Sequence, residues 1–355
     1  MSPAQTLDRL LDGQDLGEDL AAELLVALTD PGLAPAMAGA VLAALRAKGE
    51  TAAEVRGFAR AMRKLARRPD VPGDLACVDT VGTGGDGSGS LNLSTGSALL
   101  AAACGVPVVK HGNRSISSRS GSADVLESLG LELPADAAEC GACLRECGFV
   151  FLFAPHFHPA MKALAPVRAA LGVRTVFNLL GPLTNPVAPP FQVIGAYSPA
   201  AARLMADCLA GLPVERAFVV HGEPGWDEPT PVGRFLLLDV RPGAVREEQR
   251  DPAGYGLARC APEALAGGDC AHNAERLFAV LTGDERGPHR DALLLGAALA
   301  LEVSGRAEAA EQGIAMAAAA IDDGRAHALI LKLRHFFARP RQAHAGKPAR
   351  TGDLQ

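Results

Sequence analysis

Two glycine- and hydroxyl-rich segments contain the residue types that bind phosphate groups. The apolar run Val78–Val81 is followed by Gly82, Gly84 and Gly85, and glycine lets a backbone take positive φ angles that turn N–H groups toward an anion. The segment Asn92–Thr95 then precedes a second apolar run. Its polar side chains are expected to cap a helix whose free N–H groups attract negative charge. Together the segments predict a site for a polyphosphorylated small molecule.

The spacing of these glycines differs from both common nucleotide-binding fingerprints. The segment Gly82–Gly87 has neither the pattern of a P-loop nor that of a dinucleotide site. Taken alone, it fits a flexible strand-to-helix connection as well as it fits a binding loop. The next strand favours the binding loop, because Val106–Lys110 ends in Lys-His-Gly-Asn-Arg114, which is rich in donors for phosphate oxygens.

The order of elements around these motifs predicts where they lie in the fold. Each short β-branched run is followed by a polar loop and an expected helix, the second of which spans 122–129 with Ser122 as its cap. This repeat is typical of a parallel sheet, whose right-handed crossovers bring successive loops to one carboxyl edge. The glycine loop, the hydroxyls and Lys110 are therefore expected to line one crevice.

The N-terminal part of the chain has a different pattern. Residues 5–70 show helical periodicity, and Thr51-Ala-Ala-Glu54 is a capping-box sequence. After Pro72-Gly73 strands alternate with helices as far as the strand Ala217–Gly222. The predicted fold class is α/β, with a small all-helical lobe and a larger α/β lobe that contains a central, mainly parallel sheet.

Composition and charge argue against other broad classes of protein. The 355 residues, 48% of them hydrophobic, can bury a large core. The net charge of −6 argues against a nucleic-acid surface spread over the molecule. The N-terminus lacks the pattern of a signal peptide, and no stretch has the length and purity of a membrane span. We therefore expect a cytoplasmic protein with reduced cysteines.

The cysteines and histidines of the middle region offer a possible metal site. Cys140, Cys143 and Cys147 have a spacing compatible with zinc or an iron–sulfur cluster, but they lack an evident fourth ligand. The same spacing describes one face of a helix, where free cysteine packs as a small apolar side chain, and we favour that interpretation. His156 and His158 follow the strand 149–153 and are more simply explained as positional residues than as ligands.

A second chemical motif follows the strand Ala217–Gly222. Asp227 and Glu228 are adjacent carboxylates in a strand-exit loop, which suits Mg²⁺, a hard cation that takes one or two carboxylates together with phosphate oxygens and waters. Alone, such a pair is more often a solvated surface loop. The residues alone therefore favour the surface loop, and a magnesium site requires support from the wider resemblance described next.

Five ordered motifs resemble those of the anthranilate phosphoribosyltransferase family. Members of this family act in tryptophan biosynthesis and belong to the nucleoside phosphorylase-like class of phosphoribosyltransferases. The resemblance covers roughly residues 5–335, and it is carried by Gly82–Asp86, Asn92–Thr95, Lys110–Arg114, Ser120–Glu127 and Arg174–Pro186. It implies transfer of the phosphoribosyl group of 5-phosphoribosyl 1-pyrophosphate (PRPP) to the amine of anthranilate, with pyrophosphate as the second product.

The resemblance also implies a division into lobes and an assembly. The helical lobe would comprise residues 1–72 with an inserted stretch near 163–190, and the α/β lobe would comprise 73–162 and 191–337. A hinge between them would close on the substrates, and a homodimer would form through the helical lobe. The tail 338–355, rich in Arg, Pro, Ala and Gly, is expected to be frayed.

Individual site residues follow from the same resemblance. Lys110, Asp227 and Glu228 would be catalytic; Ser94, Asp227 and Glu228 would hold Mg²⁺ as the cofactor; and Gly82, Asn113 and Arg168 would bind anthranilate. Without the resemblance, Arg168 would be a helix-surface arginine. The implied PRPP contacts are Gly82, Gly84, Gly85, Asp86, Ser90, Asn92, Leu93, Ser94, Thr95, Lys110, His111, Gly112, Asn113, Arg114, Ser115, Ser117, Ser118 and Ser122.

Some positions depart from the family pattern, and two other functions stay open. Ser90-Leu91 replaces the usual Thr-Phe, Ala163-Leu164 changes one wall of the acceptor pocket, Gly296 replaces a common asparagine, and the loop before Asp227 is unusual. One alternative is a pyrimidine nucleoside phosphorylase relative, which would not need the acidic pair. The other is a non-catalytic nucleic-acid-binding relative, which the acidic net charge disfavours.

Overall fold

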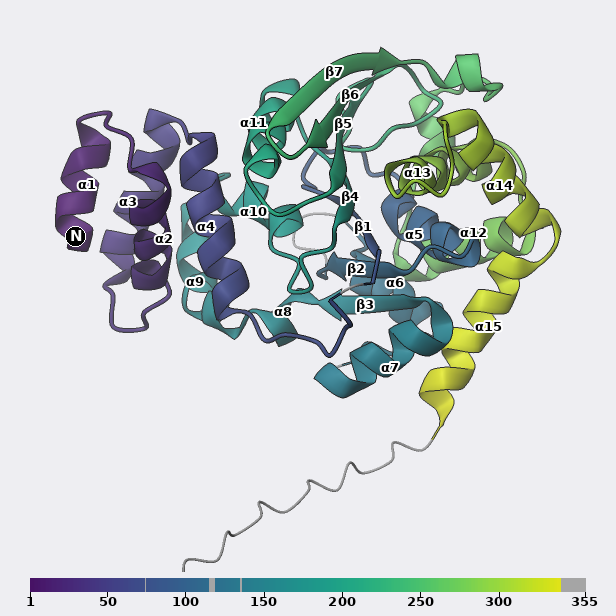
Figure 1. The fold of residues 1–355 in the computed structure, drawn as a ribbon, viewed down its shortest axis with the longest axis horizontal. Helices are drawn as coiled ribbons and strands as arrows, with labels where there is room; N and C mark the ends of the chain where they lie inside the picture. The colour runs from purple at the N-terminus through teal and green to yellow at the C-terminus, as the bar shows by residue number, and fades with distance from the viewer. Residues whose placement is uncertain (74, 115–118, 135, 340–355) are drawn as a thin grey trace, which may run out of the picture.

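A bundle of helices forms the N-terminal part of the molecule (Figure 1). The computed structural model describes residues 1–73, 75–114, 119–134 and 136–339. The expected capping box is confirmed at the last bundle helix, where the Glu54 N–H donates to Thr51 Oγ1 (3.3 Å) and the Thr51 N–H donates to Glu54 Oε2 (2.8 Å). The bundle helices are α1 (Pro3–Leu11), α2 (Gly17–Leu28), α3 (Pro35–Lys48) and α4 (Ala52–Leu65).

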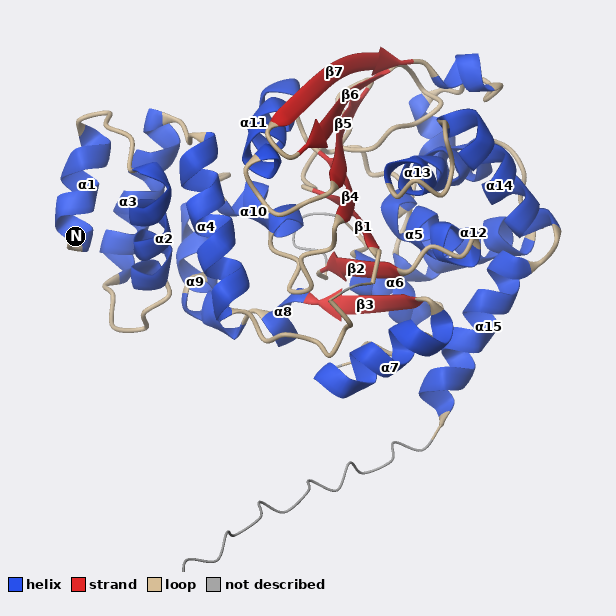
Figure 2. Cartoon of the chain, viewed as in Figure 1, coloured by secondary structure: helices blue, strands red, loops and turns tan. Residues whose placement is uncertain are grey.

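A seven-stranded sheet in the described ranges forms the centre of the larger lobe (Figure 2). Its spatial order is β3-β2-β1-β4-β5-β6-β7; β1 to β5 pair in parallel, and β6 and β7 add antiparallel at one edge. The expectation of a mainly parallel sheet is therefore confirmed. The strands are β1 (Val78–Gly82), β2 (Val108–Gly112), β3 (Phe149–Phe153), β4 (Phe191–Gly195), β5 (Arg216–Gly222), β6 (Phe235–Arg241) and β7 (Ala244–Arg250).

Helices cover both faces of the sheet, and the two faces belong to different apolar cores. Alternate strand residues point to opposite faces; accordingly Phe218 and Val220 pack with α5 and α12–α15, whereas Ala217 and Val219 pack with α10, α11 and the bundle. The remaining helices are α5 (Leu93–Ala103), α6 (Ser122–Ser128), α7 (Ala137–Cys147), α8 (Ala154–Phe157), η1 (Pro159–Ala163), α9 (Ala165–Leu171), α10 (Phe177–Leu183), α11 (Pro199–Ala210), η2 (Pro252–Tyr255), η3 (Pro262–Leu265), α12 (Cys270–Thr282), α13 (Pro288–Val303), α14 (Ala310–Asp322) and α15 (Arg325–Ala338).

Two helix ends differ from the sequence prediction. Helix α6 is capped by Gly121 instead of Ser122, because the Asp124 carboxylate accepts the Gly121 N–H at 3.0 Å and Ser122 becomes the first helical residue. Ala338 is the last residue of α15, and Arg339 pairs with Glu146 at 2.7 Å, so the expected frayed tail does not begin at 338. Residues 340–355 lie outside the described part of the chain.

No helix among the described residues is long and apolar enough to cross a membrane.

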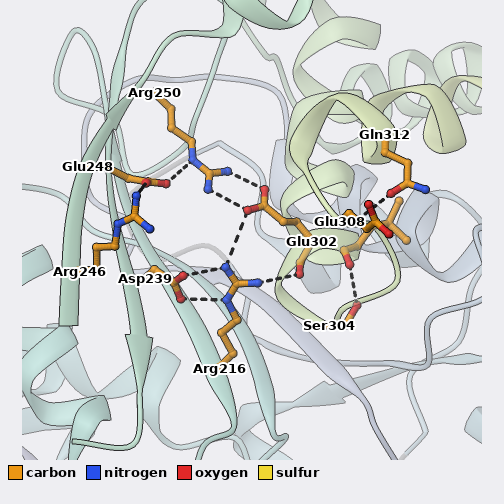
Figure 3. A network of polar contacts seen from close by, with 10 residues as sticks. Arg216, Asp239, Arg246, Glu248, Arg250, Glu302, Ser304, Glu308 and Gln312 are labelled. Atoms are coloured by element: carbon orange, nitrogen blue, oxygen red, sulfur yellow. Dashed lines mark hydrogen bonds and ion pairs between the residues drawn. The ribbon is translucent and has the colours of Figure 1, made fainter. Parts of the chain in front are cut away.

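A network of ion pairs ties the antiparallel edge of the sheet to α13 (Figure 3). Arg216 of β5 donates to both carboxylate oxygens of Asp239 in β6, at 2.9 and 2.7 Å. Arg250 of β7 donates in the same bidentate way to Glu302 of α13, at 2.6 and 2.8 Å. The Glu302 side chain is only 6% exposed, so its charge depends on these partners for compensation.

Candidate active site

The acidic loop after β5 folds back across the carboxyl edge of the sheet. Strands β1, β4 and β5 each end in a glycine, namely Gly82, Gly195 and Gly222. A Cβ atom at Gly82 would lie 2.5 Å from Asp227 Oδ2, and Cβ atoms at the other two positions would collide with the main-chain oxygens of Asp227 and Glu228. Glycine at the strand ends thus makes room for the loop. Gly195 and Gly222 received no role from the sequence, although their shared place at strand ends was a usable signal.

The glycine loop after β1 meets this acidic loop directly. The Gly84 N–H donates to Asp227 Oδ2 at 2.5 Å, and the Thr83 hydroxyl donates to the same oxygen at 3.4 Å. In return, the Asp227 N–H donates to Asp86 Oδ2 at 3.2 Å. Gly84 and Gly85 adopt positive φ angles of 68° and 70°, as the predicted turn requires. The N–H of Gly84, expected to face a phosphate, faces a carboxylate in this structure.

The N-terminus of α5 and Lys110 complete the same edge. The Ser94 N–H donates to Glu228 Oε1 at 3.1 Å, so this helix terminus binds a carboxylate. Lys110 Nζ donates to the Thr80 carbonyl at 2.5 Å and to Ser94 Oγ at 3.3 Å. The structure therefore brings together the predicted catalytic and metal-binding residues from three separate segments of the chain.

The electrostatics of this cluster are unbalanced. Burial and then the charge of Asp86 raise the pKa of Asp227 to about 7, and burial and then Asp227 raise the pKa of Glu228 to about 8. Burial lowers the pKa of Lys110, against the attraction of Asp79 and Glu228. The carboxylates have one buried lysine for compensation, and their hard oxygen donors fit a divalent cation such as Mg²⁺. Within the described residues no group of three or more His, Cys, Asp or Glu side chains is placed to hold a metal ion.

A buried carboxylate beneath the cluster supports Lys110 and its neighbour. Asp79 of β1 is fully buried; it accepts the His111 N–H at 3.2 Å and the Asn185 side-chain amide at 2.9 Å. Burial raises the pKa of Asp79 to about 6, and Lys110 opposes that shift. Asn185 follows α10 and also donates to the Val109 carbonyl at 2.8 Å. Neither Asp79 nor Asn185 was identified as a site residue from the sequence, because their contact joins residues more than a hundred positions apart.

The predicted capping role of Asn92 is only half correct. Asn92 is the N-cap residue of α5 by position, but its side chain makes no capping hydrogen bond. Its amide instead donates to the Ser120 carbonyl (3.2 Å) and its Oδ1 accepts from Asn273 (2.9 Å). Asn92 therefore ties α5 to α6 and α12 rather than closing its own helix end.

The expected acceptor residues come from three elements: Gly82 ends β1, Asn113 follows β2, and Arg168 lies in α9. Arg168 of α9 lies with its guanidinium 5.2 Å from the centre of the Phe177 ring, and burial lowers its pKa. Its guanidinium makes no hydrogen bond or ion pair within the described residues. Asn113 Oδ1 accepts the Arg114 N–H at 2.7 Å. Among the described residues, the charge of Arg168 has no paired carboxylate.

Two buried histidines, His111 and His158, lie in contact, which the sequence did not predict. The rings of His111 and His158 pack edge to face at 5.1 Å, and the Nε2 atoms of both have no hydrogen-bond partner in the described structure. Burial lowers the pKa of His111 to about 3 and that of His158 to about 4, so both are neutral at pH 7. From the sequence, His158 was interpreted as a positional residue. Its contact with His111 of the Lys-His-Gly-Asn motif is tertiary, so the sequence contains no local signal for it.

Other predicted contacts are placed unevenly. The guanidinium of Arg114 forms ion pairs with Asp124 (2.7 Å) and Glu127 (2.6 Å) on α6, so its charge is committed there. The hydroxyls of Ser88 and Ser90 share a hydrogen bond at 3.2 Å, and the Ser88 hydroxyl also donates to Asp86 Oδ1 at 2.9 Å. Ser90 is thereby connected to the glycine loop. Ser115, Ser117 and Ser118 lie outside the described residues. The remaining predicted contacts, each in or beside the β1–α5 and β2–α6 connections, are Leu93, Thr95, Gly112 and Ser122.

Two further motifs prove structural. Cys140, Cys143 and Cys147 lie on one buried face of α7, and the Cys143 thiol donates to the Phe149 carbonyl at 3.3 Å. This is the apolar packing that the sequence favoured over a metal site. Gly296 of α13 faces Ser97 of α5 so closely that a Cβ atom there would collide with the serine hydroxyl, which gives this departure from the family pattern a packing reason.

Both lobes match models of one protein class, the glycosyl transferases. Residues 4–66 match the model described as "Glycosyl transferase family, helical bundle domain", and residues 74–327 match "Glycosyl transferase family, a/b domain". The protein is therefore a member of this two-domain class, and its helical bundle and its sheet correspond to the two domains.

Similar proteins narrow the class further. Anthranilate phosphoribosyltransferase from Desulforudis audaxviator is 48% identical over 94% of this chain and 96% of its own, and that from Rubrobacter xylanophilus is 44% identical over 97% and 99%. The crystal structure of the Thermus thermophilus enzyme has a TM-score of 0.88 at 43% identity, covering 94% of this chain and 99% of that one. The Saccharomyces cerevisiae enzyme in complex with PRPP and Mg has a TM-score of 0.85 at 25% identity, covering 94% and 97%. The chain belongs to the anthranilate phosphoribosyltransferase family.

Proposed function

We propose that the residues gathered at the carboxyl edge of β1, β2 and β5 carry out phosphoribosyl transfer from PRPP to the amine of anthranilate, giving N-(5-phosphoribosyl)anthranilate and pyrophosphate. The observation that supports this most is the meeting of Asp227 and Glu228 with the glycine loop and the α5 N-terminus beside Lys110. The reaction is an early step of tryptophan biosynthesis. The relatives favour it over the phosphorylase and the nucleic-acid-binding alternatives.

The chemical task of the cluster is to stabilise the leaving pyrophosphate. As the bond from the ribose carbon to pyrophosphate breaks, positive charge develops on the sugar and negative charge on the departing oxygens. Asp227, Glu228 and Ser94 would hold Mg²⁺, which as cofactor neutralises phosphate oxygens when bound. Lys110 adds a buried positive charge beside Ser94, where few waters screen it. These groups are fixed before the reaction, so little reorganisation is required.

The acceptor needs orientation more than activation. Anthranilate carries a carboxylate, and the uncommitted guanidinium of Arg168 is suited to bind it. Asn113 and the backbone of Gly82 would orient the amine. We keep the other PRPP contacts as proposals on the basis of their place in the β1–α5 and β2–α6 connections, with Asp86, Ser90 and Asn92 held there by the hydrogen bonds described above.

We also infer the lobe boundaries, the assembly and the location. The helical lobe would comprise residues 1–72 with the insert 163–190, and a homodimer would form through it. Leu11 and Val26 of this lobe are exposed apolar side chains (69% and 51%) that a partner could cover. Light scattering of Leu11→Glu and Val26→Glu should show a monomer where the parent is a dimer. The protein would act in the cytoplasm.

The decisive experiment follows the loss of anthranilate fluorescence on mixing the protein with PRPP and Mg²⁺. Loss that stops with EDTA and is strongly reduced in Arg168→Ala is the expected result. Matched Arg203→Ala, which removes an exposed arginine paired with Glu247, should react like the parent. Absence of any loss, with pyrophosphate released from another amine, would overturn anthranilate as the acceptor.

A further inference from the structure

Arg174, in the connection between α9 and α10, joins the helical lobe to the glycine loop. Arg46, in the last turn of α3, donates from Nη1 to the Arg174 carbonyl at 2.6 Å. The Arg174 guanidinium lies 4.1 Å from the centre of the Tyr197 ring, and its Nη2 donates to the carbonyl oxygen of Gly85. The exposed side chain of Arg174 thus contacts both Tyr197, which follows β4, and the glycine loop. The main chain of the same residue is bound by Arg46 of the helical bundle.

The peptide that Arg174 contacts is one that could easily turn over. Gly84 and Gly85 both have positive φ angles, and consecutive glycines have more conformational freedom than any other residues. The loop before Gly85 is fixed by Thr83 and Gly84, which bond to Gly195 and Asp227. For the carbonyl of Gly85, the Arg174 guanidinium is the partner in the described structure. Arg174 therefore controls the orientation of this peptide.

We propose that Arg174 is a positioning residue for PRPP binding, because it draws the Gly85 carbonyl outward. In a trans peptide the carbonyl and the following N–H point in opposite directions, so this contact turns the Asp86 N–H away from Arg174. Within the described residues the N–H groups of Gly85 and Asp86 donate to no protein acceptor, so both stay available for an anion. If the peptide turned over, the carbonyl oxygen would face the anion and repel it. The inference rests on the proposed role of the glycine loop in PRPP binding.

Binding of PRPP in the absence of anthranilate tests the proposal separately from catalysis. Calorimetric titration with PRPP and Mg²⁺ should give a Kd about tenfold higher for Arg174→Ala than for the parent, since one charge-assisted contact and one peptide orientation are lost. Arg174→Lys, which keeps the charge without the planar stacking, should be intermediate. In steady-state assays the KM for PRPP should rise, while kcat and the KM for anthranilate should stay within about twofold.

Control variants make the outcome interpretable. Arg203→Ala and Tyr197→Phe, which keeps the ring beneath the guanidinium, should bind PRPP like the parent. Arg174 is exposed, so its replacement should leave the melting temperature unchanged. Parent-like PRPP binding by Arg174→Ala would overturn the inference, and so would an effect confined to the KM for anthranilate, which would make Arg174 an acceptor contact. Failure of the parent itself to bind PRPP would instead overturn the proposed function.

Discussion

Two charged clusters lie at opposite ends of strand β5, one around Arg216 at its start and one in the loop after Gly222, and they differ in how their charges are compensated. Around Glu302, two arginines and two carboxylates pair in bidentate geometry (Figure 3). Around Asp227, Asp86 and Glu228 share the site with Lys110 as the buried cation, and burial and mutual repulsion raise the pKa of Asp227 and that of Glu228 to about 7 and about 8. The first cluster is electrically complete within the protein; the second becomes complete only with a cation.

The difference shows how to separate structural from functional charge in one fold. A compensated buried network holds elements together, and removing one member leaves a stranded partner. An uncompensated cluster weakens the folded state and is retained for what it binds. The following predictions test that contrast.

The largest effect is expected from removing both acidic residues of the site. Asp227→Ala combined with Glu228→Ala should lower turnover by at least about 10³-fold, because the metal and the leaving pyrophosphate lose their support. The melting temperature without Mg²⁺ should not fall, since the lost charges were uncompensated. A coupled assay for pyrophosphate and a melting curve measure the two quantities. A variant that stays active would sink the proposed magnesium role, and one that unfolds would break the contrast.

Removing Glu302 should have the opposite profile. Glu302→Ala leaves Arg250 with Glu248 as its carboxylate partner and removes part of the support of Arg216. Because two short charge-assisted hydrogen bonds in a poorly hydrated setting are lost, the free energy of unfolding should fall by about 2–3 kcal/mol. The folded fraction should keep normal KM values. Glu247→Ala, which breaks the exposed pair with Arg203, should cost no more than about 1 kcal/mol. Urea denaturation of both variants checks the difference; equal losses would contradict the assigned role of burial.

The pH dependence of stability sharpens the same comparison. The folded-state pKa values of Asp227 and Glu228 are raised above those of the unfolded chain to about 7 and about 8, so the folded protein binds more protons between about pH 4 and pH 8. Stability without metal should therefore fall as pH rises through this window. Asp227→Asn with Glu228→Gln should flatten that slope. A parent protein whose urea midpoint is independent of pH between 5 and 8 would refute the uncompensated state.

A smaller effect is expected where α13 and α5 connect the two clusters. Gly296→Ala places a methyl group against Ser97, which should lower the free energy of unfolding by about 1–2 kcal/mol through overpacking. Because α5 also carries Ser94, the KM for PRPP should rise slightly. Relieving the contact with Ser97→Gly in the same chain should restore both values, and no recovery would mean that the two positions are not coupled.

The sequence alone predicted those parts of the site that depend on local patterns. The glycine turn at Gly84 follows from residue type, and its meeting with Lys110 follows from the common edge of parallel strands. Recognition of the family motifs added the acidic pair. Local propensity failed at Asn92, whose capping side chain is taken by partners distant in sequence, and at Ser122, where Asp124 favours a cap one residue earlier.

Residues that act across the fold were not predictable in this way. Asn185 contacts Asp79 and Val109, and Arg174 contacts Gly85, only when the region of α9 and α10 is packed against the sheet. Gly195 and Gly222 must be glycine because the loop that contains Asp227 and Glu228 packs directly against them. Nothing in their immediate neighbourhood along the chain specifies these contacts, because each depends on tertiary packing.

The division of the apolar core along the sheet constrains how the lobes can move. Side chains from α2–α4, α9–α11 and one face of β4–β6 form a single continuous layer, so the bundle is not joined to the sheet by a free linker. Wide rotation about one pivot would open this layer to water at a cost of about 25 cal/mol for each Å² exposed. Sliding of helices over one another keeps the layer buried. Any closure of the lobes over substrates is therefore expected to proceed by small sliding movements of packed helices rather than by rotation about a single hinge.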